Sequence, residues 1–510
     1  MINHATKILE NVFGYKSFKG PQKDIIEHLL KGGDALVLMP TGGGKSLCYQ
    51  IPALYLEGMA IVVSPLIALM QDQIAALQHL GIKAESLNST LDFKEVLAIE
   101  KDIENGRLKL LYVSPEKLKS GRLLDLLKKS KISLFAIDEA HCISQWGHDF
   151  RPEYTQFALL KEQFPTTPII ALTATADMAT RKDIVKNLHL QKGAEFICSF
   201  DRPNIEYTVK QKDNEKKQLL DFIKTVHMED SGIVYCLSRK KTEEIAAFLN
   251  ENGCKAYAYH AGMNDKDRAK TQRIFTAGDN VIIVATIAFG MGINKPDVRF
   301  VAHMDLPKSI ESYYQETGRA GRDGLPADAF MVYGLKDIVQ LRRFIDESDA
   351  PEKQKRLEHS KLNSLIGYAE TPVCRRKVLL EYFGETLEKP CNHCDNCQNP
   401  PLVHDATQDM LKLLSCIYRT STDRFAYGSK HIIDVLRGKQ TDKITAAGHN
   451  TLSTFNIGAE MSEVFWKTLI REAIIRRLAI TDEHGALRLT PAAYDFFKNP
   501  TTINVTQAVI

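Results

Sequence analysis

The sequence predicts an α/β protein with two successive parallel-sheet domains, followed by a helical module that carries a cysteine cluster and by a winged helix. Along residues 1–340, short apolar runs alternate with helical segments, and each run is apolar throughout. Parallel strands joined by helices are buried on both faces, so they read as continuous apolar runs. A cysteine cluster and a final apolar–turn–apolar segment predict the other two units.

The first α/β domain is predicted over residues 1–205 and the second over 206–340. Candidate strands of the first are Ala35–Leu38, Ala60–Val63, Leu110–Val113, Leu134–Ile137 and Ile169–Leu172. Candidate strands of the second are Gly232–Tyr235, Ala256–Tyr259, Val281–Val284 and Phe300–His303.

Beyond these domains the chain becomes helical. Residues 341–402 are charged and end in the cysteine cluster, which predicts a metal-binding module. Residues 403–500 finish in Leu478–Leu489, a short hairpin with His484 and Gly485 at its turn, as in a winged helix. Residues 501–510 are predicted to be a tail.

The composition is that of a folded protein without a membrane segment. The 510 residues are 44% hydrophobic, and 66 Lys and Arg against 63 Asp and Glu give a net charge of +3. Any nucleic-acid track must therefore be local. Six of the ten cysteines are scattered, as is typical of reduced thiols. We expect a cytoplasmic protein, nucleoid-associated if bacterial, with no membrane partner.

A glycine-rich segment, MPTGGGKS at 39–46, lies between a predicted strand and a predicted helix. A phosphate-binding loop needs this context, because glycines let backbone N–H groups approach phosphates at a helix N-terminus. Lys45 is expected to reach the β- and γ-phosphates and Ser46 to hold Mg²⁺; a plain glycine turn would need neither. The loop residues are Thr41, Gly42, Gly43, Gly44, Lys45 and Ser46.

Two further segments fit the same chemistry. Asp138 and Glu139 follow a predicted strand, where one carboxylate can hold Mg²⁺ and the next can orient a water. In the second domain, Arg319 and Arg322 follow Gln315 and share a helix face if this stretch is helical. Across an interdomain cleft they would act on the phosphates as arginine fingers do. A helix-terminal acidic pair and solvent-exposed arginines are the plainer alternatives.

The segment at 144–152, SQWGHDFRP, follows the acidic pair and holds one of only two tryptophans. Two aromatics, a histidine and an arginine in a Gly- and Pro-bounded loop are typical of a base-stacking platform. Packing of the loop onto the core is the alternative. The candidate DNA-binding residues are Gln145, Trp146, His148, Phe150 and Arg151.

The cysteine cluster comprises Cys374, Cys391, Cys394 and Cys397. Four thiolates make a closed tetrahedral zinc site, which is structural. An iron–sulfur centre is the alternative, but its motif needs a further cysteine three residues on, which this sequence lacks. His393 is a spare candidate ligand.

Taken in order, these motifs resemble those of superfamily 2 helicases, and more closely the RecQ family. The resemblance covers residues 9 to about 490. Further matching segments are Phe13–Tyr15 with Phe18 and Gln22, Thr173–Thr175, Phe200–Asn204, His260–Gly262 and Ala285–Gly292. It implies two RecA-like domains, a zinc module and a RecQ C-terminal winged helix.

The resemblance also implies residue roles. Tyr15 would stack on adenine and Gln22 would hydrogen-bond its edge. Lys19 stands where the family has Arg, which keeps the charge but not the bidentate fork. Asn294 stands where it has Asp. The loop at 144–152 looks like the aromatic-rich loop that couples DNA binding to ATP hydrolysis.

The implied function is an ATP-dependent DNA helicase that moves 3′ to 5′ on single-stranded DNA and unwinds duplex or branched DNA in repair, recombination and fork maintenance. Expected cofactors are ATP, Mg²⁺ and structural Zn²⁺. Expected partners are single-stranded, duplex and forked DNA and a single-stranded-DNA-binding protein, with the chain a monomer. Many relatives add a helical HRDC domain, which this sequence lacks. In its winged helix, Trp466, Lys467 and Arg471 could touch duplex phosphates, although Phe465 and Trp466 suit a core better.

Two other classes of function are weighed against this. An RNA-remodelling DEAH-type ATPase shares the Asp-Glu-Ala-His motif, but the zinc module and winged helix argue against it. A non-enzymatic scaffold that binds DNA junctions would tolerate a damaged nucleotide site, whereas Lys45, Asp138, Glu139 and Arg322 are all present.

Overall fold

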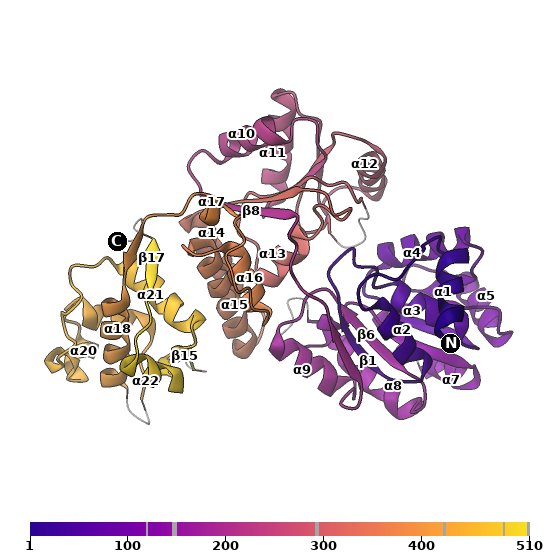
Figure 1. Ribbon diagram of the computed structural model, residues 1–510, viewed down its shortest axis with the longest axis horizontal. Helices are drawn as coiled ribbons and strands as arrows, with labels where there is room; N and C mark the ends of the chain where they lie inside the picture. Colours follow the sequence, from indigo (N-terminus) through magenta and orange to yellow (C-terminus); the bar gives the residue numbers. More distant parts are fainter. Residues whose placement is uncertain (119–120, 145–149, 291–294, 422–424, 483–484, 507–510) are drawn as a thin grey trace.

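The computed structural model describes residues 1–118, 121–144, 150–290, 295–421, 425–482 and 485–506. It contains two α/β domains with parallel sheets, a group of helices beside the second domain, and a winged helix (Figure 1). The predicted fold class is therefore confirmed. Among the described helices, none has the length and apolar character needed to cross a membrane.

Domain 1 is built on a seven-stranded parallel sheet in the order β3-β4-β2-β5-β6-β1-β7. Its strands are β1 (Ala35–Leu38), β2 (Met59–Val63), β3 (Ala84–Leu87), β4 (Leu110–Val113), β5 (Ile132–Ile137), β6 (Ile169–Thr173) and β7 (Ala194–Ile197). Its helices are α1 (Ile2–Asn11), α2 (Gln22–Leu30), α3 (Leu47–Tyr55), α4 (Ile67–His79), α5 (Phe93–Glu104), α6 (Pro115–Leu118), α7 (Gly121–Lys129), α8 (Ala158–Gln163) and α9 (Met178–Asn187). Because the strands are parallel, the segments that follow β1, β5 and β6 meet at one edge.

Domain 2 has a six-stranded parallel sheet in the order β10-β11-β9-β12-β13-β8. Its strands are β8 (Ile205–Gln211), β9 (Gly232–Tyr235), β10 (Ala256–Tyr259), β11 (Ile282–Ala285), β12 (Phe300–His303) and β13 (Ala327–Tyr333). Its helices are α10 (Glu215–Val226), α11 (Arg239–Glu251), α12 (Asp265–Ala277) and α13 (Ile310–Thr317).

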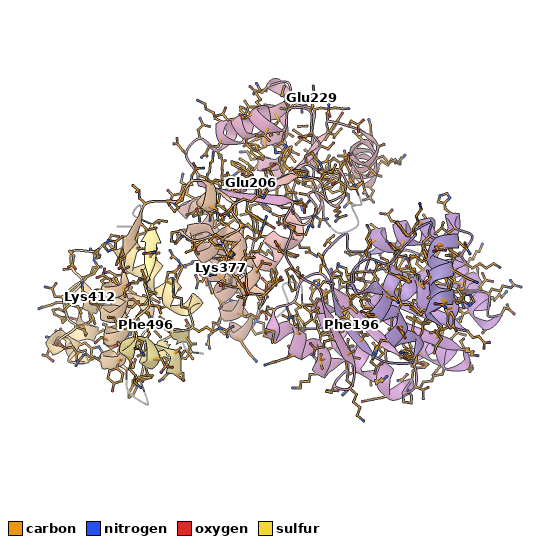
Figure 2. The ribbon with its side chains drawn as sticks, viewed as in Figure 1. Phe196, Glu206, Glu229, Lys377, Lys412 and Phe496 are labelled. Atoms are coloured by element: carbon orange, nitrogen blue, oxygen red, sulfur yellow. The ribbon has the colours of Figure 1, made fainter. Side chains whose placement is uncertain are left out.

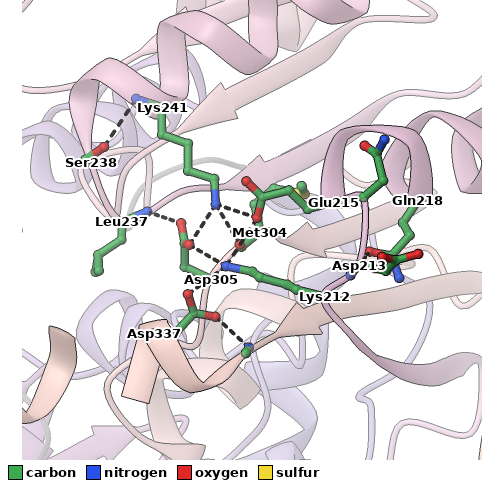
Figure 3. Close-up of polar contacts among 12 residues, drawn as sticks. Lys212, Asp213, Glu215, Gln218, Leu237, Ser238, Lys241, Met304, Asp305 and Asp337 are labelled. Carbon is green, nitrogen blue, oxygen red and sulfur yellow. Dashed lines mark hydrogen bonds and ion pairs between the residues drawn. The ribbon is translucent and has the colours of Figure 1, made fainter. Parts of the chain in front are cut away.

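An ion-pair network fastens the carboxyl edge of the domain 2 sheet (Figure 3). Asp305, just after β12, accepts from both Lys212 and Lys241 at 2.8 Å through one carboxylate oxygen. Its other oxygen accepts the backbone N–H of Leu237 at 2.9 Å, and Lys212 also donates to Asp337 at 2.7 Å. These contacts join segments after β8, β9, β12 and β13, so this edge is rigidly held.

The zinc module consists of α14 (Leu335–Asp346), α15 (Glu352–Glu370), α16 (Arg375–Tyr382) and the short α17 (Asp395–Gln398). The predicted boundary at 340/341 falls inside α14. These helices lie between domain 2 and the winged helix (Figure 1).

The winged helix contains α18 (Thr407–Thr420), α19 (Ser429–Leu436), α20 (Asp442–Ala446), α21 (Glu463–Ile475) and α22 (Pro491–Lys498), with strands β14 (Val403–Asp405), β15 (Ala479–Thr481), β16 (Leu487–Leu489) and β17 (Asn504–Thr506). Strands β15 and β16 form the predicted short hairpin; His484 at its turn lies outside the described residues. The predicted tail is partly wrong, since β17 pairs with β14 and Ile503 and Val505 are buried. Side chains of this unit, Phe496 among them, pack on one another (Figure 2).

Candidate active site and metal centre

The phosphate-binding loop joins β1 to α3, and two of its glycines are required by geometry. Gly42 and Gly44 have φ values of +84° and +80°, which side chains other than glycine rarely adopt. A Cβ on Gly44 would lie 2.4 Å from Nε2 of Gln22. Lys45 lies in the loop and donates from Nζ to the carbonyl oxygen of Met39 at 3.2 Å. The loop is therefore shaped for backbone approach to an anion.

Gln22 is buried against this loop. Its Nε2 donates to the carbonyl oxygens of Gly43 and Gly44, and its Oε1 accepts the backbone N–H of Lys19 at 2.8 Å. To contact an adenine edge, the Gln22 side-chain amide would have to give up these hydrogen bonds and form new ones with the base. Tyr15 is 52% exposed at the rim of the same cleft, where its ring is open for stacking.

The acidic pair follows β5. Burial, and then repulsion from Glu139, raise the pKa of Asp138 to about 7. Glu139 is buried with a left-handed φ of +48°, and its Oε2 lies 3.3 Å from Nδ1 of His141. His141 also contacts Thr173 Oγ1 at 2.9 Å, which joins the two motifs after β5 and β6. Two buried carboxylates this close together are suited to a divalent cation, whose positive charge would offset the repulsion between them.

The two arginines that follow α13 face domain 1 but differ in their contacts. Arg319 donates to the carbonyl oxygen of Gly290, within domain 2. Arg322 instead packs on the phosphate loop, since a Cβ on Gly42 would lie 3.4 Å from its Cγ. Burial and the neighbouring guanidinium groups of Arg319 and Arg202 lower the pKa of Arg322 to about 9. Arg322 is thus the better placed of the two to act on a bound phosphate.

A single interdomain cleft of about 500 Å³ brings the predicted nucleotide residues together. Its predicted lining residues are Tyr15, Thr41, Gly42, Gly44, Lys45, Ser46, Asp138, Glu139, Gln315, Arg319 and Arg322. Lys19, Gln22 and Gly43 are not among the lining residues, although Gln22 reaches the loop through its amide.

Of the predicted aromatic-rich loop, Gln145, Trp146 and His148 lie outside the described residues, as does Asn294. Phe150 is half-buried, and Arg151 donates from Nη1 to the carbonyl oxygen of Pro65 at 3.3 Å. The backbone N–H of Arg151 bonds the carbonyl of Cys142 at 2.9 Å. The end of the loop is therefore tied to the segment that carries the acidic pair.

The four predicted cysteine ligands are brought together. The sulfur atoms of Cys374, Cys391, Cys394 and Cys397 lie within 4.8 Å of one another. This donor set and spacing fit one tetrahedral zinc ion. His393 lies outside the cluster and points its Nε2 to Glu206 at 3.4 Å, so it is not a ligand here.

The sequence marked the connector at 200–204 as a motif but assigned it no role. In the structure, Arg202 and Asn204 donate to backbone carbonyls of the segment that carries Arg322. Only the motif itself hinted at this, because the contacts join residues more than a hundred positions apart.

Four family models match the chain in succession: DEAD/DEAH box helicase at 19–184, helicase conserved C-terminal domain at 214–324, RecQ zinc-binding at 335–398 and RQC domain at 400–509. The zinc-binding match spans Cys374, Cys391, Cys394 and Cys397, and agrees with structural Zn²⁺ at this cluster.

Curated relatives and solved structures extend this match. The chain is 48% identical over 493 residues to the ATP-dependent DNA helicase RecQ of Haemophilus influenzae, covering 96% of this chain and 79% of the relative. It is 50% identical over 471 residues to that of Pasteurella multocida, covering 92% and 74%. The Mycobacterium smegmatis helicase Lhr bound to ssDNA and AMP-PNP shares the fold at 17% identity and a TM-score of 0.52, covering 94% of this chain and 60% of that one. With four successive domain matches and close identity over nearly its whole length, the chain belongs to the RecQ family of helicases.

Proposed function

We propose that the chain is an ATP-dependent DNA helicase that moves 3′ to 5′ along single-stranded DNA and unwinds duplex or branched DNA. The supporting observation is the interdomain cleft, in which Lys45, the acidic pair and Arg322 meet from two domains. A site split between domains couples hydrolysis to domain movement, because cleft closure assembles it and product release opens it. Its relatives are named ATP-dependent DNA helicases.

Each residue has a specific task in this proposal. The loop at 41–46 binds the phosphates, with Lys45 beside the transferring group. Asp138 and Ser46 would hold Mg²⁺, which would supply positive charge to the phosphates. Glu139 orients the attacking water, and Arg322 stabilises charge that develops on the transferring phosphoryl group.

The proposal extends to the partners and setting expected from the sequence. The winged helix holds duplex DNA while a single strand crosses the two domains, and the chain acts as a monomer with a single-stranded-DNA-binding protein nearby. The setting is the cytoplasm, at the nucleoid in a bacterium, in repair, recombination and fork maintenance. The order of the domains, with the winged helix after the two helicase domains, supports this division of single-stranded and duplex DNA between them.

Hydrolysis and unwinding test this proposal directly. Wild-type ATPase should rise with single-stranded DNA more than with RNA, and 3′-tailed and forked duplexes should unwind where 5′-tailed ones do not. Stimulation by RNA alone would favour the RNA-remodelling class, and absence of ATPase would favour a binding scaffold. Lys45→Ala should abolish ATPase while leaving DNA binding intact.

Arg322→Ala should bind ATP but lose hydrolysis by roughly 10³-fold, as loss of an arginine finger does. Arg319→Ala is the matched comparison, because its guanidinium is committed to the Gly290 carbonyl. Near-normal turnover in Arg322→Ala with a collapse in Arg319→Ala would reverse the assignment.

Coupling by the aromatic-rich loop is tested at Arg151, the arginine at the end of this loop. Arg151→Ala should keep basal ATPase and lose much of the stimulation by DNA, because a stacked base biases a loop that is tied to the acidic pair. If the loop only packs on the core, basal ATPase and melting temperature should fall together.

A further inference from the structure

The connector between the domains contacts the segment that carries Arg322. Arg202 belongs to the connector, and its side chain extends away from it so that the guanidinium reaches the turn that follows α13. The acceptors are the carbonyl oxygens of Gly318 (3.2 Å), Ala320 (2.8 Å) and Gly321 (3.0 Å). A planar guanidinium that satisfies three carbonyls fixes their relative positions, which a flexible ammonium does not.

A second side chain of the connector holds the same turn. Asn204 donates from Nδ2 to the carbonyl oxygens of Gly321 at 2.9 Å and Leu325 at 2.8 Å. Gly321 has a φ of +55°, and a Cβ there would lie 2.4 Å from the Asn204 amide nitrogen. The backbone immediately before Arg322 is therefore held against the connector at close approach.

The held turn is not part of a regular helix. Helix α13 ends at Thr317, and Arg319 and Arg322 stand on the turns that follow it, where the backbone N–H of Ala320 bonds the carbonyl of Thr317 and that of Gly324 bonds the carbonyl of Gly321. The connector adds side-chain donors to the carbonyls of these turns. Because a misplacement of about 1 Å can cost about 10²-fold in rate, the bonds that fix this turn matter for hydrolysis.

The zinc module holds the connector from the other side. Arg376 of α16 is buried and donates from Nη2 to the carbonyl oxygens of Arg202 (3.4 Å), Pro203 (3.2 Å) and Ile205 (2.9 Å). Phe200 stacks on Phe383 with centroids 4.5 Å apart and planes 6° apart. The connector thus lies between α16 and the arginine turn, with hydrogen bonds to both.

We propose that Arg202 is a positioning residue for ATP hydrolysis: it sets the backbone of the arginine turn, so that the interdomain connector and Arg322 move as one body. Arg202 touches no reacting atom in this role and acts through Arg322. The inference rests on the proposed function, because it presupposes that the cleft hydrolyses ATP.

A double-mutant cycle tests the inference. DNA-stimulated kcat of Arg202→Ala should fall by about 10- to 100-fold, while KM for ATP changes by less than about threefold, since the turn is displaced but the phosphate loop is intact. The double variant Arg202→Ala/Arg322→Ala should lose little beyond Arg322→Ala alone, because residues that act as a unit are not additive. Millimolar guanidinium should restore part of the activity of Arg202→Ala and none of that of Arg322→Ala/Arg202→Ala.

Lys241→Met is the matched control. Lys241 is also a half-buried cation bonded to a backbone carbonyl, that of Met304 at 2.9 Å, and to the carboxylates of Asp305 and Glu215, and none of these partners lies on the arginine turn. It should lower the melting temperature as much as Arg202→Ala while keeping kcat within about threefold. Should Arg202→Ala fail to fold, Arg202→Lys, which keeps the charge but not the fork, carries the same expectation.

Three outcomes would overturn the inference alone, and a fourth would overturn the proposed function with it. Additive losses in the double variant would mean that Arg202 acts independently of Arg322. An equal fall of kcat in Lys241→Met would mean general destabilisation of the domain. Wild-type kcat in Arg202→Ala would remove the role while leaving the proposed function standing, whereas a wild-type chain without ATPase would overturn both.

Discussion

The zinc module and the winged helix both follow the two α/β domains, yet they are attached to them differently. Buried residues of the zinc module, including Tyr368, Leu379 and Phe383, belong to one apolar cluster that extends through both domains. Polar contacts reinforce it, as Arg181 of domain 1 donates to the carbonyl oxygen of Phe383 at 2.8 Å. The zinc module is therefore built into the core that forms the nucleotide cleft.

The winged helix has a core of its own. Its buried cluster, which includes Trp466, Phe465 and Leu413, contains residues of that unit alone. Packing of α21 on α15 and an ion pair between Arg471 and Glu370 join it to the zinc module. Arg471, a candidate for duplex phosphates, is thus used in an internal contact. We therefore expect the two α/β domains to need the zinc module in order to fold, but not the winged helix.

The largest expected effect follows from loss of a zinc ligand. Cys394→Ser should give insoluble or protease-sensitive protein without ATPase, since structural zinc contributes on the order of 10 kcal/mol to a small module and this module shares the motor's core. Zinc content, limited proteolysis and ATPase measure it. Cys416→Ser, at a buried cysteine of the winged helix, is the control and should keep zinc and ATPase. A stable, zinc-free and active Cys394→Ser protein would contradict the shared core.

Removal of the winged helix should separate hydrolysis from unwinding. A chain that ends at residue 402 should keep single-strand-stimulated ATPase within about threefold, because a unit with its own core can be removed without opening its neighbour. Unwinding of forked duplexes should fall at least about tenfold as the grip on the duplex is lost. Loss of ATPase in parallel with unwinding would show that the two cores depend on each other.

A matched pair of arginine variants sharpens the comparison at the level of single contacts. Arg376→Met removes the link between α16 and the connector and should lower kcat about tenfold with zinc retained. Arg471→Met removes the link between the winged helix and α15 and should change ATPase by less than about twofold. Steady-state ATPase with melting curves distinguishes them, and equal effects on kcat would remove the distinction.

The smallest expected effect is a pH dependence confined to the winged helix. Burial, then His449 and Lys443, lower the pKa of His431 to about 4, with Asp434 opposing, and burial lowers that of His449, whose Nδ1 lies 2.8 Å from His431 Nε2. Since the unfolded chain binds these protons below pH 6.5, stability is complete above that value and is lost as pH falls toward 4.

Fluorescence of the buried Trp466 during urea unfolding, in a Trp146→Phe background, reports this dependence. The urea concentration at the unfolding midpoint should decrease as the pH is lowered from 7.5 to 5.0. In His431→Gln this decrease should be smaller. An unaltered slope in His431→Gln would exclude this pair as its origin.

Most central strands could be predicted from the sequence and most edge strands could not, although β10 is an edge strand that was predicted and β13 a central strand that was not. β1, β4 and β9 are buried at every position, so their apolar runs have the observed bounds. β7 and β8 lie at sheet edges with alternating burial, and their polar residues break the run. β17, in the predicted tail, was missed for a different reason, because a three-residue strand is too short to show a pattern.

The site, too, has parts that the sequence predicts and parts that it does not. The phosphate loop, the acidic pair and the cysteines are local patterns whose chemistry needs close sequence spacing, so they could be predicted. The choice between Arg319 and Arg322, the capture of Gln22 by the loop and the contacts of Arg202 depend on residues distant in sequence. No local pattern encodes which carbonyl a guanidinium reaches.

Helix α15 connects domain 2 mechanically to the winged helix. Its 19 residues form a rod of about 28 Å. Lys361 pairs with Glu311 of α13 at 2.8 Å, Tyr368 packs on Tyr313, and the end of the rod bears on α21. No loop interrupts α15 between Lys361 and Glu370, which pairs with Arg471 of α21, so about 13 Å of rigid helix separates the contacts with domain 2 from the contact with the winged helix. A rotation of domain 2 relative to domain 1 would therefore be passed directly to the winged helix.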